Sequence, residues 1–526
     1  MVYLVGGGAG DPGLLTQAGT AVLKRAAVVV YDALVNPALL DLCPPDTEKI
    51  YVGKSAARHT LEQDRINALL VQKARQTAGE IAPTERVVVR LKGGDPYVFG
   101  RGGEEAQYLR TQGIHFAVIP GITAGIAGPA YAGIPVTHRD FTRTVTFITG
   151  HRKQAADDHE ELPDSGLNYE SLAALGGTLV FYMGVQALPE ITRRLHAAGM
   201  AADMPAAVIQ WATYPRQRTI VSTLAGLAAA ARKAGIQAPA ITIIGQVVNL
   251  RAELNWFESR PLFGKTVLVT RTRRQAGRLS TRLADLGANV IESPVIELVP
   301  PADEFAIDQA LAQLNQYDCV VFTSPNGVEA AWRRMGELHL DARAFPRRVA
   351  AIGPATAEAL RTIGITADLA PDEFIGEKLA AELIERLGDK GDLQGKQFLL
   401  LRADIARGEL RRELIRAGAV VKDMAIYQTV APKTLCAEAI EALRNGTVDW
   451  ITFTSASTAT NLHALLPPEL RDRVARANRL SIGPITSAAL CRLGWPPTVE
   501  ATRHDIPGMI QALTIQAGSP APPPPA

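Results

Sequence analysis

The chain has 526 residues, of which 47% are hydrophobic and 21% charged, which is typical of a globular protein of about two to four domains. The formal net charge of +2 gives no global electrostatic reason to expect nucleic acid or a membrane surface as a partner. We see no signal-peptide pattern and no apolar run long enough to span a bilayer, so we expect a cytoplasmic protein.

The first elements imitate a dinucleotide-binding fingerprint. A strand is expected at 2–5, a glycine loop at 6–13, a helix at 14–26, and a second strand at 28–32 that ends on an acid. The imitation fails at Asp11, because G-x-G-x-x-G needs glycine there and a carboxylate would repel a pyrophosphate. A cationic ligand, such as the sulfonium of S-adenosylmethionine, fits better, and an NAD-dependent oxidoreductase is the competing hypothesis.

Segment 90–105 (RLKGGDPYVFGRGGEE) dominates the first half of the chain. It follows the β-branched run 87–89, which predicts a buried strand, and it precedes a helix that begins near residue 106. Loops of this kind bind ligands in open α/β sheets, and their glycines let the backbone approach a ligand closely. We therefore expect this segment to be functional.

Six motifs in order resemble the tetrapyrrole methylase family, and among its members most closely the uroporphyrinogen-III C-methyltransferases, over about residues 1–257. The motifs are VGGGAGDPG at 5–13, YDALV at 31–35, YVGK at 51–54, segment 90–105, YAGIPVTHRD at 131–140 and YMG at 182–184. The chain departs from the family at Ala9, where proline is usual, and at 210–213 (QWAT), where Glu-Asn-Gly-Thr is usual.

This resemblance implies a methylase of two subdomains (about 1–137 and 138–257) that uses S-adenosyl-L-methionine, releases S-adenosyl-L-homocysteine and forms a homodimer. It implies acid/base roles for Asp32 and Lys54. Residues implied to face the tetrapyrrole are Arg101, Glu104, Arg139 and Met183. Cofactor contacts are implied at Ala9, Gly93, Gly94, Asp95, Val98, Thr123, Ala124, Met183 and Ala212.

The chemistry of the implied reaction suits these residue types. A ring proton must leave, for which Asp32 is a plausible acceptor, and a substrate with many carboxylates needs arginines. Each residue also has a structural alternative. Asp32 could cap a helix, Lys54 could be a surface amine, Met183 could fill the core, and Arg139 could form an ion pair.

After an expected linker at 258–265, the second half repeats itself. LVTR at 268–271 returns as LLLR at 399–402, FTS at 322–324 returns at 453–455, and IGPAT at 352–356 returns as IGPIT at 482–486. Such self-similarity predicts two related α/β units. The Ser and Thr residues at their strand-to-helix turns are expected to cap helices, whose N-termini suit anionic ligands.

The repeat breaks where Ile-Glu at 296–297 corresponds to Ile-Tyr at 426–427. A phenol there could donate a proton to a leaving hydroxyl, and a packing tyrosine is the alternative. The motifs at 322–327, 352–357 and 482–486 resemble the uroporphyrinogen-III synthase family over about 264–515. This resemblance implies cyclisation of hydroxymethylbilane without a cofactor, with Tyr427 assisting loss of the hydroxyl and with Thr356 and Thr486 hydrogen-bonded to the substrate.

The expected architecture is therefore α/β, a two-subdomain methylase fold followed by a two-lobed synthase-like fold. The expected domains are 1–257 for the methylase and 266–515 for the synthase, with lobes at 266–298 with 433–515 and at 299–432, and a disordered tail at 516–526. The expected partners are small tetrapyrroles, with no nucleic acid, membrane or metal.

The product of the second family is the substrate of the first, which favours a bifunctional enzyme that makes precorrin-2. The alternative is a methylase of a later corrin intermediate joined to a tetrapyrrole-binding sensor. Four distant cysteines form no CxxC pair, so we expect buried free thiols.

Overall fold

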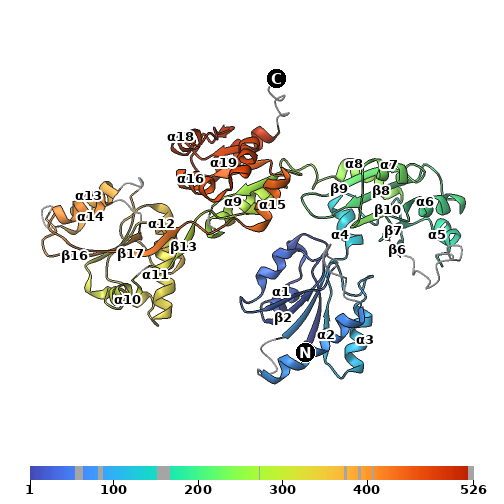
Figure 1. Cartoon of the computed structure of the whole chain (residues 1–526), viewed down its shortest axis with the longest axis horizontal. Coiled ribbons are helices and arrows are strands. Elements are labelled where there is room, and N and C mark those ends of the chain that lie inside the picture. The colour runs from blue at the N-terminus through green and yellow to red at the C-terminus, as the bar shows by residue number, and fades with distance from the viewer. Residues whose placement is uncertain are drawn as a thin grey trace. The chain divides into compact units, whose positions relative to one another are not determined.

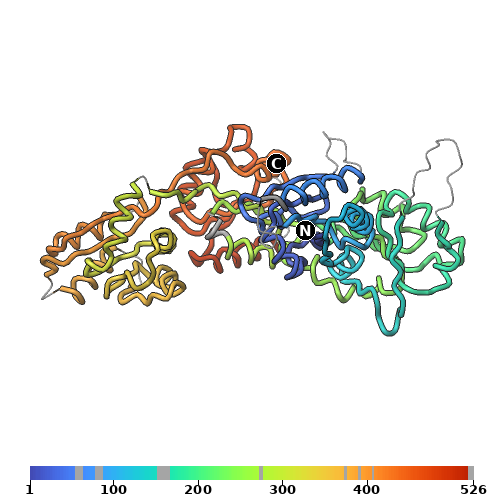
Figure 2. Tube along the Cα trace, turned by 90° about the horizontal axis from the view of Figure 1, so that it is seen from below, coloured from blue at the N-terminus to red at the C-terminus, as the bar shows by residue number. Residues whose placement is uncertain are grey.

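The structure is a computed structural model that describes residues 1–53, 63–80, 87–150, 166–271, 273–301, 303–371, 376–388, 392–404 and 408–518. The chain divides into two compact units, the first holding Met1–Val267 with two short later segments and the second holding Leu268–Ser280 and Ile291–Ala512. The described residues form four five-stranded sheets with helices around them, so the α/β class is confirmed (Figure 1). Figure 2 follows the same chain as a tube.

The first sheet is parallel and has the strand order β3-β2-β4-β1-β5. Its strands are β1 (Val2–Gly6), β2 (Ala26–Tyr31), β3 (Glu48–Tyr51), β4 (Val87–Lys92) and β5 (Phe116–Ile119). Its helices are η1 (Pro12–Leu14), α1 (Gln17–Leu23), η2 (Pro37–Leu42), α2 (Gln63–Glu80), α3 (Gly102–Thr111) and α4 (Ala124–Tyr131). One face of the sheet packs on α1 and η2, and the opposite face packs on α2 and α3 (Figure 1). Because the strands are parallel, their carboxyl ends lie along one edge.

The second sheet is mixed, with the order β6-β7-β10-β8-β9 and a parallel pair only at β6 and β7. Its strands are β6 (Val145–Thr149), β7 (Thr178–Tyr182), β8 (Pro205–Gln210), β9 (Arg218–Thr223) and β10 (Ala240–Ile244). Its helices are α5 (Tyr169–Leu175), α6 (Leu188–Ala197), α7 (Leu227–Lys233), η3 (Gln246–Leu250) and α8 (Arg251–Leu254). Both sheets belong to the first unit.

The third sheet has the order β12-β11-β18-β19-β20. Its strands are β11 (Thr266–Val269), β12 (Asn289–Glu292), β18 (Trp450–Phe453), β19 (Asn478–Ser481) and β20 (Val499–Glu500). Its helices are α9 (Arg273–Asp285), α15 (Ala437–Asn445), α16 (Ala456–Leu465), α17 (Pro468–Arg476), α18 (Pro484–Arg492) and α19 (Ile506–Ala517). In Figure 1 the yellow-green α9 lies among the orange-red helices, because this sheet combines the beginning and the end of the second half.

The fourth sheet has the order β13-β17-β16-β14-β15. Its strands are β13 (Glu297–Val299), β14 (Cys319–Phe322), β15 (Val349–Ala351), β16 (Gln397–Ala403) and β17 (Val420–Val430). Its helices are α10 (Glu304–Ala312), η4 (Leu314–Gln316), α11 (Pro325–Glu337), η5 (Ala342–Ala344), α12 (Pro354–Thr362), α13 (Gly376–Leu387) and α14 (Glu409–Arg416). Neither sheet corresponds to one copy of the sequence repeat. The third sheet joins β11 and β12 of the first copy to β18, β19 and β20 of the second, and the fourth joins β13, β14 and β15 of the first copy to β16 and β17 of the second.

Several local predictions were wrong. The helix expected at 14–26 is shorter, because the Thr16 side chain caps α1 by accepting a hydrogen bond from Gly19 N–H, and Ala26 already belongs to β2. Strand β4 continues through Lys92, so the first residues of segment 90–105 are strand rather than loop. Helix α19 includes the first two residues of the predicted tail, and residues 519–526 lie outside the described part. Two of the four free cysteines, Cys436 and Cys491, are exposed.

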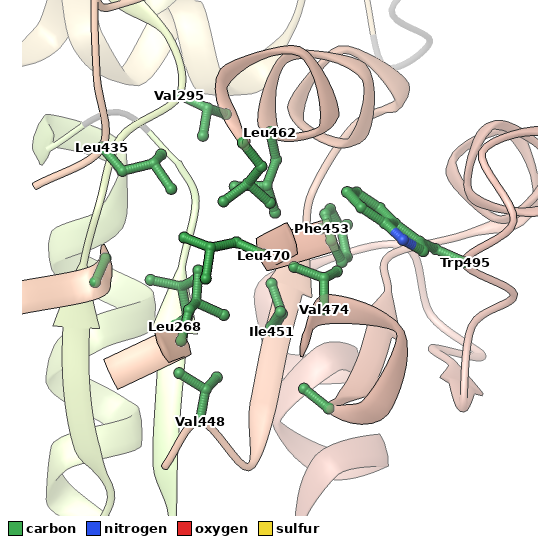
Figure 3. Packing of buried hydrophobic residues seen from close by; sticks show 14 of the residues in the cluster. Leu268, Val295, Leu435, Val448, Ile451, Phe453, Leu462, Leu470, Val474 and Trp495 are labelled. Atoms are coloured by element: carbon green, nitrogen blue, oxygen red, sulfur yellow. The ribbon is translucent and has the colours of Figure 1, made fainter. Parts of the chain in front are cut away.

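The core around the third sheet is built from large side chains contributed by both ends of the second half (Figure 3). Phe453 is fully buried on β18, beside Ile451 and Trp495 in the same cluster, while Leu268 enters from β11. Leu462 and Leu470 cover them from helices. This cluster holds sequence-distant segments in one sheet.

We predict that Phe453→Ala lowers the free energy of unfolding by about 3–5 kcal/mol, because it leaves a large cavity in a closely packed cluster. Denaturant unfolding of the whole chain, followed through its tryptophan fluorescence, measures this loss. Ile415→Ala, at a position that is 44% exposed, serves as the control and should cost less than about 1 kcal/mol. A cost that small at Phe453 would contradict the described packing.

Candidate functional site

Three glycine turns meet at the carboxyl edge of the first sheet, after β1, β4 and β5. A Cβ on Gly6 would lie 2.5 Å from the Gly121 nitrogen and 2.7 Å from the Gly94 oxygen, so the three backbones touch. Gly8 and Gly94 also pair as an antiparallel bridge, in which each N–H donates to the other carbonyl, at 3.2 and 2.6 Å. Only glycine permits this approach, so these turns form one packed platform.

The Asp95 carboxylate fastens this platform. Its Oδ2 accepts a hydrogen bond from Gly121 N–H at 3.0 Å, and its Oδ1 accepts hydrogen bonds from Tyr97 N–H at 2.7 Å and Val98 N–H at 3.2 Å. The segment after β4 is therefore held both to itself and to the turn after β5. A carboxylate that accepts several backbone N–H bonds favours a fixed loop geometry.

Left-handed backbone conformations concentrate in the loops of the first unit. Met183, Trp211 and Thr213 have φ values of 53°, 49° and 70°. Of the non-glycine residues with positive φ in the described part of the chain, the others are Phe99, Arg101 and His339. Such conformations cost free energy and persist where surrounding contacts enforce them, often at ligand sites. His339 alone lies in the second unit.

The glycine turn after β1 is joined to the loop after β8. Thr213 Oγ1 accepts a hydrogen bond from Asp11 N–H at 2.8 Å and donates to the Ala9 carbonyl at 3.2 Å. The Tyr131 hydroxyl donates to Asp11 Oδ2 at 2.6 Å, and Gly13 N–H donates to Oδ1. Burial, strengthened by this contact with Asp11, raises the pKa of Tyr131 above its ordinary range. Asp11 therefore links the two subdomains through these contacts.

Tyr182, the last residue of β7, holds the start of α4. Its hydroxyl oxygen accepts a hydrogen bond from Gly125 N–H at 2.8 Å and lies 2.8 Å from Thr123 Oγ1. Burial raises the pKa of Tyr182, so the phenol stays protonated at neutral pH. The next residue, Met183, is 51% exposed, and the ring of Phe99 contacts Tyr182 at 4.9 Å between centroids.

An ionic network lies behind the platform. Arg90 donates from Nη2 to Asp32 Oδ2 and from Nε to Glu105 Oε1, both at 3.1 Å, and Lys92 Nζ lies 3.0 Å from the same Glu105 oxygen. Arg90, Lys92 and Glu105 are at most 4% exposed. Asp32 is partly exposed at the sheet edge, where Leu34 N–H donates to its Oδ1 at 3.1 Å.

In the second unit, polar groups gather where strands lead into helices. Ser324 caps α11, accepting a hydrogen bond from Gly327 N–H at 3.0 Å, and its Oγ lies 3.1 Å from the Tyr427 hydroxyl. Ser455 caps α16 in the same way, so the predicted hydroxyl caps are confirmed at these two helices. Thr356 and Thr486 occupy the first turns of α12 and α18, and both are almost fully buried.

Comparisons with known proteins agree with this geometry. The family model for tetrapyrrole (corrin/porphyrin) methylases matches residues 1–228, and that for uroporphyrinogen-III synthase HemD matches residues 277–511. A porphyrin biosynthesis protein HemD from Ruminiclostridium josui is 36% identical over 87% of this chain and 87% of its own length. This chain belongs to the tetrapyrrole methylase and HemD synthase families, joined in one polypeptide.

Two further relatives carry methyltransferase names. A uroporphyrinogen-III C-methyltransferase from Bacillus subtilis (strain 168) is 39% identical over 73% of this chain and 77% of its own length. An S-adenosyl-L-methionine-dependent uroporphyrinogen III methyltransferase from Methanosarcina barkeri is 51% identical over 47% of this chain and 92% of its own length.

Most of the predicted methylase residues lie in these loops. Gly93, Gly94 and Asp95 belong to the platform, and Thr123 and Ala124 begin α4 beside it. Val98, Ala124 and Ala212 pack against one apolar cluster, and the carbonyl of Ala9 contacts Thr213. Arg101 and Glu104 are exposed and pair with each other, and Arg139 is exposed. Lys54 lies outside the described residues.

The sequence analysis missed the roles of Arg90, Lys92 and Tyr182. Arg90 and Lys92 are two residues apart in a strand, so they lie on one face of the sheet, and a charged pair inside an apolar strand was a readable signal. Tyr182 was quoted only as part of a family motif. Nothing in the sequence indicated that its hydroxyl reaches Thr123, because that contact depends on tertiary structure.

We predict that Tyr182→Phe loosens the start of α4, because Gly125 N–H loses its acceptor at a cost of about 1–3 kcal/mol. Hydrogen–deuterium exchange of the peptide that contains Thr123 and Gly125 should quicken at least about tenfold. Tyr169→Phe, which alters another buried tyrosine of the same unit, should leave that peptide unchanged. Equal exchange in both variants would contradict the described contact.

Proposed function

We propose that the first unit methylates uroporphyrinogen III twice with S-adenosyl-L-methionine to give precorrin-2, and that the second unit makes that substrate by cyclising hydroxymethylbilane. The main support in the first unit is the exposed apolar rim of the platform. Large hydrophobic side chains are exposed after four different strands: Leu34, Tyr97, Phe99, Ile122 and Met183. The first four follow strands of the first sheet, and Met183 follows β7 of the second sheet, next to Tyr182, whose ring contacts Phe99. Such a concentration of exposed apolar side chains suits a large ligand with an apolar ring system.

The residues present fit the methyl donor. A Cβ built on Gly94 would have no atom nearer than 3.8 Å, and the nearest atoms belong to Thr123 and Ala124, so the platform leaves room between these turns. Small residues also line the opposite loop at Ala212. When bound, S-adenosyl-L-methionine supplies an electrophilic methyl group on a cationic sulfur. The chain's own part is to align the acceptor carbon with that methyl, because an in-line displacement gains most from alignment.

The roles of the named side chains follow from where they lie. We assign proton acceptance to Asp32, whose two oxygens are oriented by Arg90 and by Leu34 N–H at the sheet edge. Arg101, Glu104, Arg139 and Met183 are exposed, as contact with the tetrapyrrole and its carboxylates requires. Lys54 keeps its proposed acid/base role on the strength of the motif at 51–54 alone.

For the second unit, we assign the assisting proton donor to Tyr427, whose hydroxyl lies beside Ser324 at the start of α11. Helix N-termini carry unpaired N–H groups and a positive partial charge, so α11, α12, α16 and α18 offer places for substrate carboxylates. Thr356 and Thr486 are buried and their backbone N–H groups donate to the Gly353 and Gly483 carbonyls, so we expect their hydroxyls to contact substrate after a small local shift. This half needs no cofactor for a dehydrating ring closure.

We also propose a cytoplasmic homodimer with a methylase of 1–257 and a synthase of 266–515. No helix among the described residues has the length and apolar character needed to cross a membrane. In that same part of the chain no group of three or more His, Cys, Asp or Glu side chains is arranged to hold a metal ion.

One experiment tests the whole proposal. Purified protein is supplied with hydroxymethylbilane and labelled S-adenosyl-L-methionine, and the product is identified by mass and by the number of labelled methyl groups. Two labels on the product expected for precorrin-2 support the proposal. Methylation only of a later corrin, with no cyclisation, would replace it with the methylase-and-sensor alternative.

We predict that Tyr427→Phe lowers the rate of cyclisation by about 10- to 100-fold, because the proton donor is removed while the ring is kept. Cyclisation is measured from hydroxymethylbilane, and methylation of supplied uroporphyrinogen III should stay unchanged as an internal control. Tyr317→Phe, at another tyrosine of the same lobe, is the matched control. A wild-type rate in Tyr427→Phe would make this residue a packing tyrosine.

A further inference from the structure

The ionic network of the first sheet lies in an apolar core, which is unusual for residues with a purely structural role. Arg90 and Lys92 project from the central strand β4 on the face of the sheet where Val2, Leu4 and Val88 form a core. Burying charges costs several kcal/mol per ion, and apolar residues of similar volume commonly stabilise a core as well or better. Stability alone therefore does not account for two cations at this position.

Glu105 is the hub of the network. Its Oε1 accepts hydrogen bonds from Arg90 Nε, Lys92 Nζ and Gln63 Nε2, at 3.1, 3.0 and 3.2 Å. Its Oε2 has no hydrogen-bond partner among the described residues, and the residue is 0% exposed. An unpaired carboxylate oxygen in the core is costly, which again indicates that the charge of Glu105 serves more than packing.

The network contains two positive and two negative side chains, and one of the negative ones is partly exposed. Arg90 and Lys92 are cationic, Glu105 and Asp32 are anionic, and only Asp32 reaches the sheet edge. Burial lowers the pKa of Lys92, and the neighbouring Arg90 lowers it further, while Glu105 opposes both effects. From the other elements that pack here, α2 contributes Asp64 and the neutral amide of Gln63, while Arg101 at the start of α3 pairs with Glu104 in its first turn.

We propose that Glu105, Arg90 and Lys92 are positioning residues that orient the Asp32 carboxylate and fix the pH range in which it accepts the ring proton during methyl transfer. Arg90 forms the bridge, because its Nη2 holds Asp32 Oδ2 while its Nε is held by Glu105. Glu105 offsets one of the two cations, so the charge that lies behind Asp32 depends on the whole network. This inference rests on the proposed methylase function.

Two single variants should shift the acid limb of the pH–rate profile in opposite directions. Glu105→Gln removes an anion, which favours the ionised form of Asp32, so the acid limb of the pH–rate profile should move down by about 0.5–1.5 pH units. The maximal rate should fall about two- to tenfold in that variant, because a weaker base accepts the proton. Lys92→Met removes a cation and should move the limb up by a similar amount. The double variant should return the limb close to the wild-type position.

The measurement is the initial rate of labelled methyl transfer to supplied uroporphyrinogen III, at saturating S-adenosyl-L-methionine, over a series of pH values. Glu48→Gln is the matched control, because it removes an anion of the same subdomain from the exposed pair with Lys73 and should move nothing. The affinity for S-adenosyl-L-homocysteine should change by less than about twofold in every variant, since the network is not assigned to the cofactor pocket.

The outcomes separate the two proposals. If the wild-type chain transfers no methyl group to uroporphyrinogen III, the proposed function fails. If the wild-type chain is active and Asp32→Asn abolishes transfer, the pH–rate profiles decide. An acid limb that stays in place in Glu105→Gln and Lys92→Met, or that moves in the same direction in both, overturns the network's role. An active Asp32→Asn variant also overturns it, because Asp32 is then not the group being oriented. If one single variant fails to fold, the other decides: its limb must move in the stated direction relative to Glu48→Gln, and a limb that stays in place overturns the network's role.

Discussion

The methylase site depends on the contact of three backbones at one sheet edge. Gly6, Gly94 and Gly121 lie so close that an added Cβ on Gly6 or Gly121 would overlap the neighbouring main chain. The Asp95 carboxylate then accepts hydrogen bonds from backbone N–H groups of these turns, at Tyr97, Val98 and Gly121. The turns that follow β1, β4 and β5 are therefore fixed relative to one another before any ligand binds. A preorganised platform of this kind loses little conformational freedom on binding.

The loops after the strands of the second sheet contain residues in strained left-handed conformations, and contacts between the subdomains keep these residues in place. In the segment 210–213 the left-handed conformations fall on Trp211 and Thr213 and not on Ala212. Thr213 is held by Asp11 and Ala9, and Trp211 is covered by the Arg216 guanidinium at 3.7 Å from its ring centroid. These contacts hold the loop after β8 against the glycine turn after β1.

How much could be predicted from the sequence depends on how far apart in the chain the interacting residues lie. Strands, glycine turns and caps are local, so segment 90–105 and the hydroxyl caps at Ser324 and Ser455 were recognised from the residues alone. Asp11 breaks the dinucleotide fingerprint in the sequence, but its bonds to Tyr131 and Thr213 join residues far apart in the chain and were not predicted. The burial of Arg90 and Lys92 was also missed, because it depends on ion pairs with Glu105 and Asp32, which come from other elements of the fold. The repeat was visible in the residues, while the pairing of 266–298 with 433–515 in one lobe was implied only by the resemblance to the synthase family.

The two units differ in where their charges lie. The second unit presents helix N-termini at its turns, whose partial charges come from the backbone and need no buried ion, and Leu, Val and Phe side chains fill its sheets. Under the proposed function, the first unit must also remove a proton from carbon, which a backbone dipole cannot do. The proposal gives that task to the Asp32 carboxylate at the sheet edge, which Arg90 holds from inside the sheet. Glu105 lies behind Arg90 and offsets its buried charge, so the base that the proposal needs at the surface is backed by a charged core.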